Sequence, residues 1–246
     1  MNDVVGKSFR VAVVMPAYRS RHLIGKVIES VPDFVNKIYV VDDACPERTG
    51  DYVEQHVNDK RVEVIHHESN LGVGGATISG LKKLQEGDFD LAVKIDSDGQ
   101  MDPSDIPLLL EPLVSNEADY AKGNRFNSLD DLQEMPKKRI FGNAVLSLMS
   151  KVSTGYWSIT DPTNGFFAIK VGVLRRINLD KVRKRWFFES DLLFRLSIIR
   201  AVVQDVPLPA RYGTEKSNLR IRKIIWEFLS RHFINYLKRM FYVYYL

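Results

Sequence analysis

The chain has almost no cysteine and no long apolar run. The first absence argues against a disulfide-stabilised protein, and the second against a membrane-spanning segment within this sequence. Cys45 is the single cysteine among 246 residues, which excludes a disulfide framework and fits a reducing compartment. No stretch of about 18 apolar residues occurs, so the sequence predicts no transmembrane helix. Hydrophobic residues make up 45% of the chain, enough for a sizeable core. These features predict one large globular domain or two small ones.

Net positive charge is also absent until the end of the chain. From Arg211 onward there are eight Lys or Arg and two Glu, a net charge of +6, whereas the first 210 residues carry −2. The same tail holds nine aromatic residues. A basic, aromatic ending is typical of a segment that binds an anionic membrane surface or phosphate groups. No nucleic-acid recognition motif accompanies it, so we expect no nucleic-acid partner.

Apolar segments alternate with turn residues in a βα rhythm through the first half of the chain. This alternation predicts a largely parallel sheet with helices on both faces and ligands at its carboxyl edge. The second half is less regular, and we interpret the whole as one domain with a C-terminal appendage. The expected strands are 11–15, 37–41, 62–65, 91–95, 120–124 and 166–169. The expected helices are 21–31, 49–57, 105–113, 139–151 and 189–200, with a further helix that follows the glycine-rich loop 70–75 and ends at about 85.

Two aspartates one residue apart, Asp96 and Asp98, follow the fourth expected strand. Burying a carboxylate is costly unless a partner offsets the charge. At the carboxyl edge of such a sheet the partner is often a ligand or a metal, and oxygen ligands suit Mg²⁺ or Mn²⁺. The alternative is a solvated turn at the end of a strand.

A glycine cluster, Gly72-Val-Gly74-Gly75, precedes the third expected helix. It does not fit the dinucleotide fingerprint, because Thr77 stands where Gly or Ala is needed and the cluster follows the third strand. It is not a phosphate-binding P-loop either, because no Gly-Lys-Ser/Thr follows. A mobile connection at a helix start is the remaining interpretation.

Eight short motifs follow one another in order. They are Val14-Met-Pro-Ala-Tyr18, Val40-Val-Asp-Asp-Ala44, Asn70-Leu-Gly72, Asp96-Ser-Asp98 with Gln100, Gly123-Asn-Arg125, Asp161-Pro-Thr-Asn-Gly-Phe166, Phe188-Glu-Ser-Asp191 and Glu215-Lys-Ser217. Their order and spacing resemble the family-2 glycosyltransferases of the GT-A fold, in particular the polyprenyl-phosphate sugar transferases related to dolichol-phosphate mannosyltransferase. The resemblance runs from about residue 11 to residue 223.

The resemblance implies an α/β GT-A catalytic domain with a mostly parallel sheet at residues 1–215. A basic, aromatic, amphipathic helical segment, juxtamembrane in character, would follow at residues 216–246. It further implies that Pro16, Ala17 and Tyr18 hold the base of a nucleotide-sugar donor. Asp42 and Asp43 would accept hydrogen bonds from the base and the ribose.

The resemblance also assigns a site for a divalent cation, Mg²⁺ or Mn²⁺. Asp98 would bind the metal that bridges the donor diphosphate, and Gln100 would be a further ligand. Asp96 belongs to the same site, where it would contact ribose or sugar hydroxyls as well.

Four cations complete the implied site. Arg125, Lys216, Arg220 and Lys223 would hold the donor diphosphate or the acceptor phosphate.

The implied reaction is a single inverting displacement at the anomeric carbon. A lipid-phosphate acceptor is already anionic and needs no general base. If the acceptor is instead a sugar hydroxyl, as in a glycan-extending transferase, Asp191 is the expected base. Glu189 would then face elsewhere, because residues two apart do not share a helix face. Both carboxylates could also serve only to start a helix, and a silent nucleotide-sugar-binding module is a further alternative.

Apolar residues recur at near-helical spacing from Ile221 to Tyr244, with Lys and Arg between them. This pattern predicts either a helix docked on the domain or an interfacial helix whose basic side chains reach lipid phosphates. We expect a peripheral enzyme on the cytoplasmic face of a membrane, the inner membrane in a bacterium. We also expect a natural chain that continues into membrane spans, and a homo-oligomer is possible.

Overall fold

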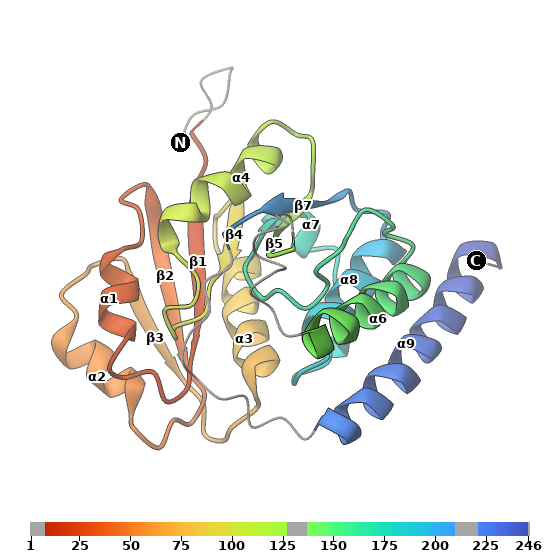
Figure 1. Ribbon diagram of the computed structural model, residues 1–246. Helices are drawn as coiled ribbons and strands as arrows, with labels where there is room; N and C mark the ends of the chain where they lie inside the picture. The colour runs from red at the N-terminus through yellow and green to blue at the C-terminus, as the bar shows by residue number, and fades with distance from the viewer. Residues whose placement is uncertain (1–7, 127–136, 210–220, 246) are drawn as a thin grey trace.

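The computed structural model describes residues 8–126, 137–209 and 221–245, which form one α/β domain around a central sheet (Figure 1). The sheet has seven strands in the order β3-β2-β1-β4-β6-β5-β7. The strands are β1 Val11–Ala17, β2 Val35–Asp42, β3 Val62–His66, β4 Leu91–Lys94, β5 Tyr120–Asn124, β6 Phe167–Lys170 and β7 Val203–Pro207.

The sheet is parallel except at β6. Strand β1 pairs in parallel with β2 and β4, and β2 pairs in parallel with β3. Strand β6 lies antiparallel between β4 and β5, and β5 pairs in parallel with β7. The carboxyl ends of β1, β2, β3 and β4 therefore meet at one edge, as the alternation of the sequence predicts.

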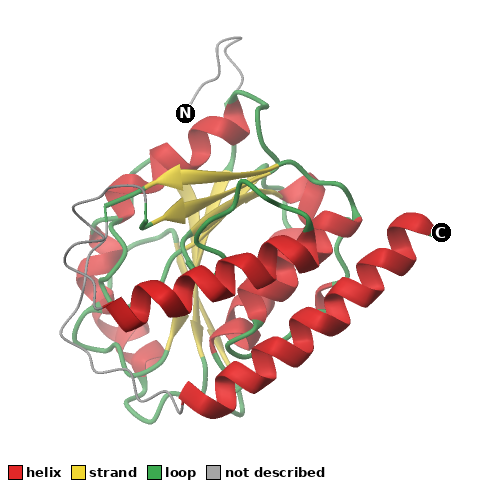
Figure 2. Ribbon diagram, turned by 45° about the vertical axis from the view of Figure 1, so that its right-hand side comes forward, coloured by secondary structure: helices red, strands yellow, loops and turns green. Residues whose placement is uncertain are grey.

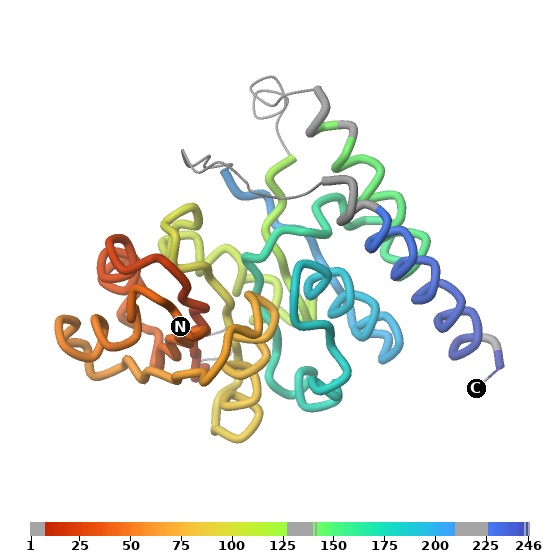
Figure 3. The backbone as a smooth tube through the Cα atoms, turned by 90° about the horizontal axis from the view of Figure 1, so that it is seen from below, coloured from red at the N-terminus to blue at the C-terminus, as the bar shows by residue number. Residues whose placement is uncertain are grey.

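Helices cover both faces of the sheet (Figure 2). One apolar core lies between the sheet and α1, α2 and α4, and a second lies between the sheet and α3, α7 and α8. Helices α6 and α9 lie side by side on the outside of the second layer (Figures 1 and 3). The helices are α1 Ile24–Glu29, α2 Thr49–His56, α3 Val73–Glu86, α4 Ile106–Val114, α6 Lys137–Thr154, α7 Val171–Leu174, α8 Phe188–Ile198 and α9 Ile221–Tyr244, with 3-10 turns at η1 Pro103–Asp105 and η2 Leu179–Lys181.

The C-terminal helix α9 docks on α6 and α8 through a mixed face. Phe228, His232 and Asn235 are all buried on that side, whereas Trp226 and Phe233 on other sides are 74% and 61% exposed. The helix thus has a docked face and an apolar exposed face. Among the described residues, no helix combines the length and apolar character needed to cross a bilayer. The expected boundary between residues 215 and 216 lies outside the described residues.

Candidate active site

Two hydroxyl groups and one backbone contact bring the loops after β1, β2 and β4 together. The Ser97 hydroxyl donates to the Pro16 carbonyl at 2.8 Å and lies 2.8 Å from Ser20 Oγ. The Asp43 N–H donates to the Ala17 carbonyl at 3.1 Å. Three of the predicted site segments therefore lie beside one another at the carboxyl edge of the sheet.

In the first of these segments, Pro16 and Ala17 are buried at the end of β1, and Tyr18 is 45% exposed. The Arg19 guanidinium lies 5.4 Å from the centre of the Tyr18 ring. An accessible aromatic ring of this kind can stack on a nucleotide base. The assignment of this loop to the base stays a prediction.

Asp42 lies buried at the end of β2 and shapes the loop that follows it. Its Oδ1 accepts from the Cys45 N–H at 2.7 Å, and its Oδ2 accepts from the Gly50 N–H at 2.5 Å. Gly50 has no room for a side chain, because a Cβ there would lie 2.9 Å from the Asp42 Cβ. One carboxylate thus fixes both the loop and the first turn of α2.

Asp43, also buried, fixes the start of α3 in the same way. Its two oxygens accept from the N–H groups of Leu71 at 2.8 Å and Gly72 at 2.7 Å. His67 Nδ1 lies 2.8 Å from Asp43 Oδ1. Any contact of Asp42 or Asp43 with a nucleotide must use the lone pairs that these bonds leave, and that role stays a prediction.

Asp96, Asp98 and Gln100 lie on the loop after β4, as predicted. The side chain of Asp96 is 27% exposed, Asp98 is partly exposed and Gln100 is exposed. Asp98 Oδ1 accepts from the Gln100 N–H at 3.0 Å, and Gly99 between them has a φ of +74°. The side chains offer only oxygen donors on a solvent-accessible loop, which fits Mg²⁺ or Mn²⁺.

A lysine that the sequence interpretation did not single out lies directly beneath this loop. Lys94 is 1% exposed, and its Nζ donates to Asp96 Oδ1 at 2.6 Å. A Cβ on Gly165 would lie 2.5 Å from Lys94 Nζ, 3.3 Å from Asp96 Oδ2 and 3.4 Å from Glu189 Oε1. The charged groups of Lys94, Asp96 and Glu189 therefore all approach Gly165, where a larger side chain would not fit.

Glu189 is thus the α8 carboxylate that reaches the acidic loop. Burial raises its pKa above the ordinary value, and the positive charges of Lys94 and Lys122 act in the opposite direction. The raised pKa favours a carboxyl group that can take up a proton near the site.

Asp191 points away from Lys94, towards α9, and its expected role as the base for a sugar hydroxyl stays a prediction. Its Oδ2 accepts from the Arg183 N–H at 3.1 Å and lies 3.5 Å from Arg195 Nη2. Its Oδ1 accepts from Asn235 Nδ2 at 3.2 Å. Asp191 therefore connects α8 to α9. Helical periodicity predicted that the two carboxylates face different ways, and their different contacts agree with this.

The glycine cluster explains why α8 starts at this place. The Gly75 N–H donates to the Lys184 carbonyl at 2.7 Å. A Cβ on Gly74 would lie 2.5 Å from the Phe188 Cβ and 2.8 Å from the Lys184 carbonyl carbon. Gly74 and Gly75 thus allow the segment before α8 to pack against the start of α3, which replaces the expected mobile connection.

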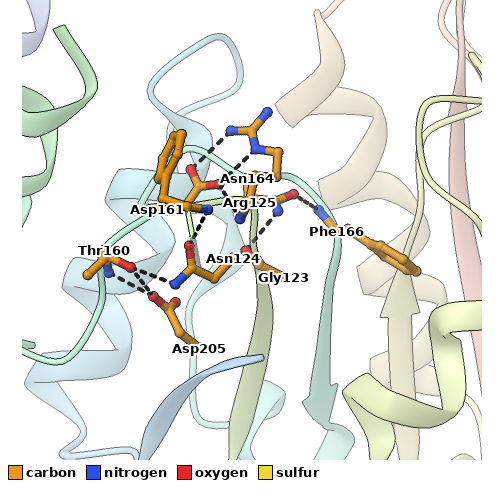
Figure 4. Close-up of polar contacts among 9 residues, drawn as sticks. Gly123, Asn124, Arg125, Thr160, Asp161, Asn164, Phe166 and Asp205 are labelled. Carbon is orange, nitrogen blue, oxygen red and sulfur yellow. Dashed lines mark hydrogen bonds and ion pairs between the residues drawn. The ribbon is translucent and has the colours of Figure 1, made fainter. Parts of the chain in front are cut away.

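Arg125 follows β5 and pairs with the buried carboxylate of Asp161 (Figure 4). Its Nε lies 2.7 Å from Asp161 Oδ2, and its Nη2 lies 3.0 Å from Oδ1. The Arg125 side chain remains 32% exposed, whereas that of Asp161 is fully buried. Arg125 and Gln100 line one shallow pocket with Asn164. The Arg125 side chain and the predicted metal ligand Gln100 therefore lie on the wall of the same pocket.

Amide and hydroxyl groups hold the two loops around this ion pair. Asn164 Nδ2 donates to the Gly123 carbonyl at 2.7 Å. Asn124 Nδ2 donates to Thr160 Oγ1 at 2.7 Å, and that hydroxyl donates to Asp205 Oδ2 at 2.9 Å (Figure 4). The motif Asp161-Pro-Thr-Asn-Gly-Phe166 therefore serves to fix the end of β5.

Three predicted phosphate-binding cations cannot be placed. Lys216 and Arg220 lie outside the described residues, and so does the side chain of Lys223. A separate group, Asp51, Glu54 and His66, brings possible ligand atoms within 4.8 Å of one another on α2 and β3.

Known proteins match both the sequence and the fold. The model of glycosyl transferase family 2 matches residues 12–177. The UDP-N-acetylglucosamine–dolichyl-phosphate N-acetylglucosaminyltransferase of Methanococcus voltae is 30% identical over 85% of this chain and 88% of its own length. The undecaprenyl-phosphate mannosyltransferase of Micrococcus luteus is 30% identical over 81% of this chain and 82% of its own length.

Among solved structures, glucosyl-3-phosphoglycerate synthase from Mycobacterium tuberculosis, crystallised with Mn²⁺, UDP and glucosyl-3-phosphoglycerate, has the same fold. Its TM-score is 0.68 at 18% identity, over 94% of this chain and 80% of that chain. From the matched family model and the relatives together, the chain belongs to glycosyl transferase family 2 and is a glycosyltransferase with a GT-A fold.

Proposed function

We propose that this glycosyltransferase moves a sugar from a UDP- or GDP-sugar to a polyprenyl phosphate, with Mg²⁺ or Mn²⁺ as its cation. The observation that carries the proposal is the convergence of the Tyr18, Asp43 and Asp98 loops at one edge of the sheet. Two relatives named for transfer to dolichyl or undecaprenyl phosphate support the choice of acceptor.

The residues of the site divide the work of donor binding. Asp98 and Gln100 would hold the cation, with Asp96 beside them, and a bound cation would stabilise the negative charge of the departing nucleoside diphosphate. Because the Lys94 ammonium already contacts Asp96, Asp96 is better suited to accept hydrogen bonds from ribose or sugar hydroxyls. Arg125 pairs with Asp161 but stays partly exposed on the pocket wall, so it would bind a phosphate group.

A lipid phosphate is the simpler acceptor for this arrangement. Its oxygen is anionic near neutral pH and attacks the anomeric carbon without a general base. Asp191, the expected base for a sugar hydroxyl, is committed to Arg183 and Asn235. Transfer to lipid phosphate therefore needs no general base from the described site.

Glycan extension is the second candidate, and Glu189 is the observation that favours it. This carboxyl group faces Asp96 across Gly165 and has a pKa raised by burial. A carboxylate of this kind can accept the proton of a sugar hydroxyl. In that reaction Glu189, and not Asp191, would be the base.

We also propose a peripheral location at the cytoplasmic face of a membrane, with residues 1–215 as the catalytic domain and 216–246 as the segment that meets the lipid. The exposed aromatic residues of α9 support this division, and Lys238 adds an exposed positive charge. A homo-oligomer stays a proposal that no observation favours.

Donor binding tests the proposal directly. UDP-sugars or GDP-sugars with Mn²⁺ should raise the melting temperature, and a chelator should remove most of the rise. Asp98→Asn should abolish the Mn²⁺-dependent part. Asp88→Asn is the matched control, because its carboxylate is 93% exposed and precedes β4 at the opposite edge of the sheet.

Two results would decide against the proposal. An Mn²⁺-dependent rise in the melting temperature of the Asp98→Asn variant as large as that of the wild type would remove Asp98 from the cation site. A protein that binds a nucleotide-sugar yet transfers sugar to a glycan and not to a polyprenyl phosphate would instead support the second candidate.

A further inference from the structure

The strand β4 ends in a buried positive charge directly under the acidic loop. Lys94 is the last residue of β4 and is 1% exposed. Its ammonium contacts Asp96 Oδ1 at 2.6 Å. Because a buried ammonium without a partner is costly, this contact fixes both the lysine and the carboxylate.

A second carboxylate, that of Glu189, lies close enough for the charge of Lys94 to lower its pKa against the effect of burial. The space above Gly165 is bordered by Lys94 Nζ, Asp96 Oδ2 and Glu189 Oε1, at 2.5, 3.3 and 3.4 Å from where a Cβ would lie. Lys94 therefore has one direct acidic partner, Asp96, and a second acidic group nearby. Its buried ammonium cannot reach solvent without leaving Asp96.

This arrangement changes what the acidic loop offers to a divalent cation. A cation held by Asp98, with Asp96 beside it, would lie near the Lys94 ammonium, and charges of the same sign repel each other. The phosphates of a nucleoside diphosphate would add negative charge and offset that repulsion.

We propose that Lys94 is a built-in counter-ion of Asp96 that keeps the affinity for a bare divalent cation low, so that the cation is taken up together with the anionic nucleoside diphosphate. The inference rests on the proposed cation site at Asp98. It gives Lys94, which contacts the site through the Asp96 side chain, a role in cation binding. The joint uptake of cation and nucleotide would then follow from the protein's own charges.

A second buried lysine provides a matched comparison. Lys122 on β5 is fully buried, and it and Lys94 both pair in register with Phe167 of β6, so the two share one face of the sheet. Within the described residues Lys122 Nζ has no hydrogen-bond partner, and burial lowers its pKa to about 8. It resembles Lys94 in burial but has no contact with Asp96.

The test measures Mn²⁺ binding to the full chain by the loss of the free-ion paramagnetic resonance signal, first without nucleotide. Lys94→Met should bind bare Mn²⁺ about tenfold more tightly than the wild type, since one positive charge near the site is removed. Lys122→Met should bind it as the wild type does. Added UDP or GDP should tighten Mn²⁺ binding strongly in the wild type and much less in Lys94→Met.

A second variant moves the ammonium without deleting it. Gly165→Ala places a methyl group against Lys94 Nζ, so it should raise the affinity for bare Mn²⁺ in the same direction but less. Circular dichroism and an unfolding curve establish that each variant is folded. If Lys94→Met fails to fold, the Gly165→Ala result alone decides.

The inference is overturned if Lys94→Met and Gly165→Ala bind bare Mn²⁺ no more tightly than the wild type, or if Lys122→Met gains as much as Lys94→Met. The proposed function fails differently. In that case the wild type would bind no nucleotide-sugar, or would bind it equally well with Mn²⁺ and with a chelator.

Discussion

Glu189 and Asp191 lie two residues apart on α8, yet one faces Lys94 and the other faces α9. Their positions follow from the start of α8, which the contacts of Gly74 and Gly75 with the preceding segment determine. A rotation of the helix by about 100° per residue separates their side chains. Two acidic groups in one short motif therefore have unrelated surroundings.

Asp191→Asn should lower stability by about 2 kcal/mol, because the carboxylate receives hydrogen bonds from Arg183 and Asn235 in a buried place. The turnover rate at saturating substrate should stay within a few-fold of the wild type. Urea unfolding and an assay with polyprenyl phosphate check the two parts. A hundredfold loss of turnover at unchanged stability would restore Asp191 as the base.

The sequence predicts the residues at the carboxyl edge better than those beneath them. Asp98 and Gln100 could be placed because each motif directly follows an apolar strand in a parallel order. Lys94 and Glu189 could not, because both approach the space beside Gly165, which is far from both in the sequence and has no side chain to reveal its neighbours. The roles of Asp42 and Asp43 in fixing loops also depend on backbone groups that no pattern specifies.

At the scale of elements, His232 connects α9 to the domain. Its Nδ1 lies 2.8 Å from Ser153 Oγ on α6, and its ring centre lies 4.9 Å from that of Phe187. Burial lowers the pKa of His232 to about 4 from an ordinary value of 6.5. The docked helix therefore requires a neutral imidazole.

The pKa of His232 predicts a loss of stability in mild acid. The folded state has the lower pKa, so the unfolded state binds the proton first, and stability falls as the pH drops from about 6.5 towards 4. The loss should reach about 3 kcal/mol and level off below pH 4. His232→Phe should remove this part of the pH dependence, and urea unfolding at pH 7, 5.5 and 4.5 measures the difference. Parallel curves for the two proteins would contradict the prediction.

The expected elements agree with the structure where the apolar pattern is long. Strands β1 to β6 appear within a few residues of their predicted positions. Strand β7 was not predicted, because Gln204, Asp205 and Pro207 interrupt its short apolar pattern at the edge of the sheet. Its pairing with β5 supplies the stabilisation that the local sequence lacks.

At the scale of the whole molecule, α6 and α9 lie side by side on the outside of the domain (Figure 3), and both carry exposed apolar side chains. Single exposed apolar residues are common on protein surfaces, but several on two neighbouring helices indicate an interaction surface. They are Val145, Leu148 and Val152 on α6 and Trp226, Leu229, Phe233, Leu237, Met240 and Phe241 on α9.

The Trp226→Ser, Phe233→Ser double variant should bind anionic phosphatidylglycerol vesicles several-fold more weakly than the wild type. Both side chains are more than half exposed, so the melting temperature should hardly change. Vesicle sedimentation at low and high salt checks the binding. Val202→Ser is the control, because Val202 is also apolar and 55% exposed but precedes β7. A loss of binding as large in this control would argue against an interfacial role for α9.

The antiparallel position of β6 between β4 and β5 also affects how the chain folds during its synthesis. During synthesis β1 to β4 emerge first and can pair with one another at once, whereas β5 emerges before the strand that joins it to them. At a synthesis rate of roughly ten residues per second, the edge of β4 stays without its partner β6 for several seconds. An unpaired strand edge invites intermolecular association, so the nascent chain is most in need of chaperone protection while it is still half made.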